Sequence, residues 1–219
     1  MTNAREEIFK RIRQSTRRSS SIEDSEAIVS KRLGQHSRGC LPAYTEPALE
    51  RFIARAEKAS ASVITIPHIN EFGKALSGYL AEHGLQQRIA AAPSPMLDEV
   101  SWPDGYQVER RIAEATDQVA VSVAFSGIAE TGTLALLSGS QTPTTLNFLA
   151  DNYICLLQQN DIVAHMEDVW DRVRTHQGGM PRTLNFITGP SRTADVEQTI
   201  QLGAHGPRRL LIIIVMQEP

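Results

Sequence analysis

The sequence predicts an α/β protein, in which an open and mostly parallel sheet is flanked by helices and preceded by a helical N-terminal arm. Two observations carry this prediction. From Glu46 onwards, segments with helical periodicity alternate with short apolar segments, and this alternation favours parallel pairing of the strands. The run Leu210–Val215 shows no polar alternation, which is typical of a strand that is covered on both faces.

Residues 1–45 are predicted to be a helical arm followed by a linker. Ile8, Phe9 and Ile12 recur at helical spacing among charged residues. A basic, serine-rich stretch, a second polar segment and a stretch with glycine and proline follow, and none of them has the apolar density of a core. Residues 46–219 are therefore predicted to form the α/β domain.

Spacing of apolar residues predicts the elements of this domain. Leu49, Phe52 and Ala56 share one face of the first helix, and Pro67 closes the strand that follows. In chain order, we expect a helix at 46–60, a strand at 63–66, a helix at 72–83, a strand at 88–92, a helix or turn at 108–115, strands at 119–126, 134–137 and 153–157, a helix at 161–175, a strand at 184–188, a helix at 193–202 and a strand at 209–216.

The composition argues against several classes of function. The net charge is −3 at pH 7, so nothing in the overall charge favours a nucleic-acid partner. Cys40 and Cys155 are isolated in the sequence, so the chain offers no cysteine run for zinc or for an iron–sulfur cluster. The longest apolar run, Leu210–Met216, is far shorter than a membrane span, and residues 1–10 contain no apolar signal region. We therefore expect a cytoplasmic protein without membrane insertion.

The first candidate site is the polar segment 126–133, which interrupts two apolar runs. Open α/β sheets bind ligands outside the ends of their strands, so Glu130 is a candidate catalytic residue. Its neighbours Thr131, Gly132 and Thr133 are candidate substrate-binding residues. A solvated turn, in which the glycines only permit tight backbone geometry, explains the same pattern.

The second candidate is the segment 189–197, between a predicted strand and a predicted helix. Ser191, Arg192 and Thr193 could bind a phosphate or carboxylate through hydroxyl and charge-assisted hydrogen bonds at the start of the helix. Asp195 is also a candidate, although a carboxylate in the first turn already complements the helix dipole and would repel a second anion. The alternative is that Ser191 or Thr193 simply caps the helix.

The third candidate is His205, which lies among glycines in the segment 203–207. A loop histidine can act as a general acid or base near neutral pH, although such residues are often only solvated. The other histidines show no metal-ligand spacing with it, so no metal site is predicted. We expect His205 to share one cleft, at the carboxyl ends of the sheet, with Glu130, Thr131, Ser191 and Arg192.

Taken together, the segments 128–133, 189–197 and 203–207 resemble in their order and spacing the signatures of the LUD-domain family. The resemblance extends from about Glu46 to the C-terminus. It implies a fold similar to the NagB/RpiA/CoA-transferase superfamily and a role in the oxidation of L-lactate to pyruvate. It also implies two iron–sulfur partner proteins, which would carry the clusters because this chain has no cluster ligands of its own.

Two functions stay open at this point. In the first, the chain is a non-catalytic or assembly subunit of the L-lactate-oxidising complex that the resemblance implies. In the second, it is a self-sufficient isomerase or transferase that acts on a small phosphorylated or carboxylated substrate. Glu130 would then be the base or nucleophile, and Arg192 would hold the anionic group. Fold analogy does not decide whether the chain is an enzyme.

Overall fold

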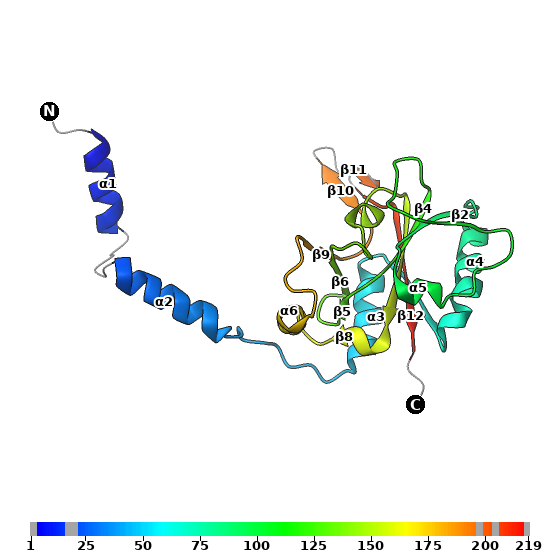
Figure 1. Cartoon of the computed structure of the whole chain (residues 1–219), viewed down its shortest axis with the longest axis horizontal. Helices are drawn as coiled ribbons and strands as arrows, with labels where there is room; N and C mark the ends of the chain where they lie inside the picture. The colour runs from blue at the N-terminus through cyan, green and yellow to red at the C-terminus, as the bar shows by residue number, and fades with distance from the viewer. Residues whose placement is uncertain (1–3, 16–21, 196–198, 203–205, 217–219) are drawn as a thin grey trace. The chain divides into compact units, whose positions relative to one another are not determined.

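The computed structural model of the chain describes residues 4–15, 22–195, 199–202 and 206–216 (Figure 1). Its internal contacts divide the chain into two compact units, Met1–Ala43 and Tyr44–Pro219. The first unit contains the helices α1 (Ala4–Ser15) and α2 (Ile22–Gln35). None of the helices that the structure describes is both long enough and apolar enough to cross a membrane.

The second unit is built on a parallel sheet with the strands β1 (Ser62–Ile66), β2 (Arg88–Ala91), β3 (Gln107–Arg110), β4 (Val119–Val123), β7 (Asn152–Gln158) and β12 (Arg209–Val215). Their order in the sheet is β1-β12-β7-β4-β2-β3, and every neighbouring pair is parallel. This confirms the predicted fold class. Residues 210–214 of β12 are all buried, as expected from the absence of polar alternation.

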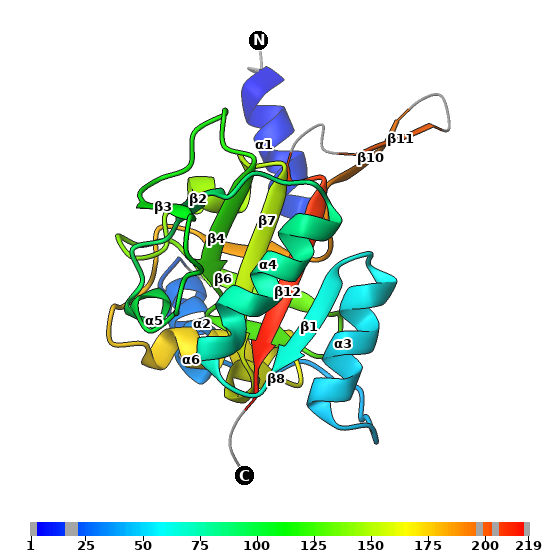
Figure 2. The same ribbon diagram turned by 90° about the vertical axis from the view of Figure 1, so that its right-hand side faces the viewer.

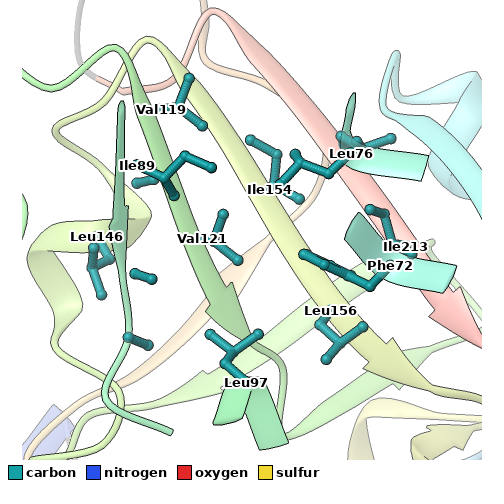
Figure 3. Close-up of a cluster of buried hydrophobic side chains, with 14 of the residues drawn as sticks. Phe72, Leu76, Ile89, Leu97, Val119, Val121, Leu146, Ile154, Leu156 and Ile213 are labelled. Carbon is teal, nitrogen blue, oxygen red and sulfur yellow. The ribbon is translucent and has the colours of Figure 1, made fainter. Parts of the chain in front are cut away.

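Helices cover both faces of this sheet. On one face α4 (Phe72–Glu82) lies across the strands, next to the short helix α5 (Pro95–Asp98) (Figure 2). Phe72 and Leu76 of α4 there join the cluster of Ile154 and Ile213 (Figure 3). The other face is covered by α3 (Ala48–Lys58), whose Phe52 is fully buried among the alternate residues of β7 and β12. Burial of side chains of this size stabilises the fold by about 1.5–3 kcal/mol each.

A second, four-stranded sheet has the order β8-β5-β6-β9. Its strands are β5 (Ser126–Ile128), β6 (Thr133–Leu137), β8 (Ile162–Val163) and β9 (Leu184–Ile187). The helix α6 (Met166–Thr175) packs Val169 and Val173 against Ile128 and Ala135 of this sheet. The polar segment of the first candidate site is therefore the hairpin of β5 and β6. Short 3-10 helices complete the domain: η1 (Ile69–Glu71), η2 (Thr144–Asn147) and η3 (Gln159–Asp161).

Three predicted elements are wrong in type or extent. The expected helix or turn at 108–115 begins instead with the strand β3, which pairs with β2. The expected helix at 193–202 is replaced by the antiparallel strands β10 (Arg192–Asp195) and β11 (Thr199–Leu202). The helix expected from residue 161 begins only at Met166, because Ile162–Val163 pairs with β5. Both misassigned segments contain β-branched residues, which favour extended pairing over helix when a partner strand is present.

Candidate functional site

Glu130 lies in the turn between β5 and β6, and its carboxylate faces His165. The distance between Glu130 Oε2 and His165 Nδ1 is 3.3 Å, and the two side chains are 27% and 13% exposed. Strand pairing holds them together, because the backbone N–H of Ala129 donates to Val163 O and that of Glu130 to Ala164 O. The contact is a hydrogen bond when Nδ1 carries a proton, so the pair can share and transfer a proton.

The start of α6 fixes the position of His165. The backbone N–H of His165 donates to Asp168 Oδ2 at 2.9 Å, and the His165 side chain accepts a hydrogen bond from the backbone N–H of Asp168. This reciprocal arrangement is a capping box, which satisfies two N–H groups that the helix leaves without partners.

His165 is not among the residues predicted for this site. The sequence suggested a test of this histidine only as a metal ligand, and the residue lies 35 positions after Glu130. The one usable signal was a polar residue followed three positions later by Asp168 at the start of an amphipathic helix, which is the pattern of a helix cap. That signal indicates where the helix begins and says nothing about Glu130.

Tyr44 connects His165 to α3. Its ring stacks on the imidazole, with 5.5 Å between the ring centroids and 27° between the planes. The guanidinium of Arg51, on α3, lies 3.4 Å from the centroid of the same tyrosine ring. Arg51 also forms an ion pair with Glu46, and its side chain is only 9% exposed. Tyr44 is therefore positioned to cover the imidazole and to restrict its orientation.

The replacement Tyr44→Ala should expose His165 and raise several-fold the rate at which diethyl pyrocarbonate modifies this imidazole. Tyr44→Phe keeps the stacked ring and should leave the rate close to that of the wild type. Mass spectrometry of the peptide that contains His165 measures the rate, with His83, directly after α4, as the internal control. An unchanged rate in Tyr44→Ala would show that Tyr44 does not cover the imidazole.

Three threonine hydroxyls join the first candidate segment to the second. Thr131 Oγ1 and Thr133 Oγ1 are 2.6 Å apart, and Thr133 Oγ1 is 2.6 Å from Thr188 Oγ1. Thr188 directly precedes the segment 189–197, so these two segments meet here. Of the predicted substrate-binding residues, the structure thus brings Thr131 and Thr133 together beside the turn that carries Glu130.

Gly132 has a packing role in the same turn. Its φ is +69°, a conformation that side chains other than glycine rarely adopt. A Cβ atom at this position would lie 2.5 Å from the carbonyl carbon of Arg55 and would overlap the backbone nitrogen of Ala56, both on α3. The close approach of the turn to α3 therefore accounts for this glycine without a ligand.

Ser191 and Arg192 follow Thr188 in the chain, and their contacts are with other segments. The backbone N–H of Ser191 donates to Pro207 O at 2.8 Å, and Pro207 comes two residues before β12 begins at Arg209. The guanidinium of Arg192 donates to the hydroxyl of Ser60, just beyond the C-terminus of α3. The expectation of a single cleft at the carboxyl ends of the sheet is therefore wrong for Ser191, which lies at the amino end of β12. The segment that carries Ser191 contacts the chain just before β12, which is parallel to its neighbours β1 and β7. The start of a parallel strand lies at the edge of the sheet opposite the carboxyl ends.

The other candidate residues of these segments are only partly described. Thr193 and Asp195 lie in β10, where they pair with Gln201 and Thr199 of β11. His205 lies outside the described residues. Their roles in binding stay predictions.

The two cysteines differ in burial and belong to different units of the chain. Cys155 is fully buried in β7, and burial raises the pKa of its thiol to about 12, so the thiol is protonated at neutral pH. Cys40 is exposed and belongs to the other unit. Within the described part of the chain, no three His, Cys, Asp or Glu side chains are grouped to hold a metal ion. Two separated cysteines do not fit the four thiolates of an iron–sulfur cluster.

Comparison with known proteins gives a family and several relatives. The sequence model described as the LUD domain matches residues 49–215. An uncharacterized protein of Neisseria meningitidis is 31% identical over 150 residues, which are 67% of this chain and 64% of that protein. Lactate utilization protein C of Geobacillus sp. WCH70 is 35% identical over 61% of this chain and 57% of its own length. Lactate utilization protein C of Bacillus subtilis is 32% identical over 61% of this chain and 58% of its own length. The chain thus spans less than two thirds of the length of each of these relatives.

A solved structure supports the fold. The crystal structure of a DUF162 family protein from Deinococcus radiodurans superimposes with a TM-score of 0.58 at 22% sequence identity. The similarity covers 80% of this chain and 99% of that one. At this level of identity the likeness concerns the fold and carries nothing about chemistry.

Proposed function

The chain belongs to the LUD-domain family, and from this premise we propose that it is a component of a system that oxidises L-lactate to pyruvate with iron–sulfur partner subunits. Two of the relatives described above carry the name lactate utilization protein C. The observation that carries a chemical role for this chain is the contact between Glu130 and His165. It supplies a carboxylate and an imidazole at a partly exposed position.

Conversion of lactate to pyruvate releases two protons, one from the C2 hydroxyl and one from C2 itself, together with two electrons. Glu130 accepts the hydroxyl proton as a general base, while His165 orients the carboxylate and relays the proton to solvent. The C2 hydrogen would leave as the second proton, which is released to solvent. The iron–sulfur clusters of the partner subunits would be the oxidant and would accept the two electrons one at a time.

The iron–sulfur clusters are expected in the partner subunits because this chain has few cysteines. The sequence contains two cysteines, and one of them is fully buried within the sheet. A cluster needs about four thiolates. The chain itself would therefore contribute the acid–base pair and the binding surface for the small anionic substrate.

The test is reconstitution of the three components. This chain is mixed with the iron–sulfur proteins that are encoded beside its gene, and reduction of an artificial electron acceptor is followed together with pyruvate formation. We expect activity with L-lactate that depends on all three proteins and is much lower with D-lactate. The proposal is overturned if the two partners oxidise L-lactate equally fast without this chain, or if the complete mixture is inactive.

A further inference from the structure

A pocket of about 490 Å³ lies at the carboxyl ends of β2 and β4. The next strand of this sheet after β2 in the chain is β3, which lies beside β2. The next one after β4 is β7, which lies beside β4 in the opposite direction along the strand order. The crevice between two such strands is the topological switch point, where open α/β sheets bind their ligands. Ser94, just after β2, and Phe125, just after β4, line it. Neither Glu130 nor His165 does, so the pocket is distinct from the acid–base pair.

One side of the pocket is the loop 138–142, which internal hydrogen bonds hold in place. The Ser138 backbone N–H donates to Thr183 O, and the Thr183 N–H donates to Ser138 Oγ, each at 2.9 Å. The Thr142 hydroxyl donates to Leu137 O at 2.6 Å. Ser140 and Gln141 form the tip of this loop. The loop is thus arranged before any ligand enters, which lowers the entropic cost of binding.

The remaining walls combine aromatic and hydroxyl groups. The rings of Phe125 and His176 meet edge to face, with 5.5 Å between their centroids. The Ser94 side chain is buried, with the residue only 8% exposed, and its hydroxyl does not cap the helix α5 that follows it. The residues that line the pocket include no Asp, Glu, Lys or Arg. A site without formal charge gives no compensation for the desolvation of an ionic ligand.

We propose that this pocket binds an uncharged molecule of about nucleoside size, with a ring that contacts Phe125 and His176 and polar groups that bond to Ser94 and Ser140. The volume lies within the roughly 300–1,000 Å³ typical of small-molecule sites, which combine apolar walls with a few placed polar groups. This inference concerns a second site and does not depend on the role proposed for Glu130.

The test uses adenosine and adenosine monophosphate as probes of the full chain, with affinities measured by isothermal titration calorimetry. We expect adenosine to bind and its monophosphate to bind at least about tenfold more weakly, because nothing in the pocket neutralises the phosphate. The variant Ser140→Asp brings a charge to the loop tip, and Ser94→Val removes the buried hydroxyl. Each should weaken adenosine binding by about tenfold or more.

The matched control is Ser77→Ala on α4, which removes a serine hydroxyl outside the pocket and should leave the affinity unchanged. Thermal unfolding of every variant confirms that the domain is intact. Three results would overturn the proposal: the monophosphate binds as tightly as adenosine, adenosine binding survives both pocket variants, or neither compound binds.

Discussion

The variant Glu130→Gln is expected to lower L-lactate oxidation by the reconstituted three-component system by about 100-fold or more. The substitution keeps the shape of the side chain and removes its capacity to take a proton. Loss of a general base typically costs on the order of 10²–10⁴ in rate. Because the Glu130 side chain is partly exposed, at 27%, and faces His165, the variant should remain folded.

The matched control is Glu82→Gln at the end of α4, on the opposite face of the six-stranded sheet, which should retain full activity. Thermal unfolding and complex formation are measured for both variants. Nearly normal activity of Glu130→Gln, with the complex intact, would eliminate the catalytic role and leave Glu130 as a turn residue beside a helix cap. Loss of activity together with loss of the complex would instead indicate a role in assembly.

The variant Gly132→Ala is expected to lower the free energy of unfolding by about 2–6 kcal/mol. Two costs add: the left-handed conformation at φ +69° costs a residue with a Cβ about 1–3 kcal/mol, and overlap with α3 costs a similar amount. The overlapped atoms belong to the backbone of Arg55 and Ala56, so no side-chain rotation relieves the contact. Urea unfolding followed by circular dichroism measures the change.

The control for this variant is Gly78→Ala, in the exposed part of α4. No atom lies within 4 Å of a Cβ at Gly78. Alanine there should stabilise the helix by about 0.5–1 kcal/mol, because it restricts the unfolded chain more than glycine does. Equal stability of the two variants would contradict the tight approach of the hairpin to α3.

Most of the fold was predictable because burial leaves a periodic trace in the sequence. Phe52 and Ala56 are fully buried on α3, as helical spacing indicated, and the run 210–214 is buried on both faces. The segments 108–115 and 193–202 were misassigned because their extended conformation depends on a partner strand. The pairing of β3 with β2 joins separate segments of the chain, and the pairing of β10 with β11 is that of a hairpin. The spacing of apolar residues within one segment reports neither partner strand.

Of the two side chains in the candidate site, Glu130 was predictable from the sequence and His165 was not. Local polarity between two apolar runs pointed to Glu130, and the order of three segments indicated the LUD-domain family, which the comparison confirms. The contact with His165 was not predictable, because it depends on the parallel pairing of β5 with β8 across 35 residues. The same holds for the pocket beside Ser94, since its lining comes from segments that no motif connects.

The sequence by itself determined the class of the fold, the buried strands and the turn that carries Glu130, because each follows from the local alternation of apolar and polar residues. Only the tertiary structure decided which side chains meet: Glu130 with His165, Tyr44 with Arg51, and Ser191 with the amino end of β12. The physical reason is that strand order and register bring distant residues within hydrogen-bonding reach, and these depend on packing of the whole domain rather than on any one segment.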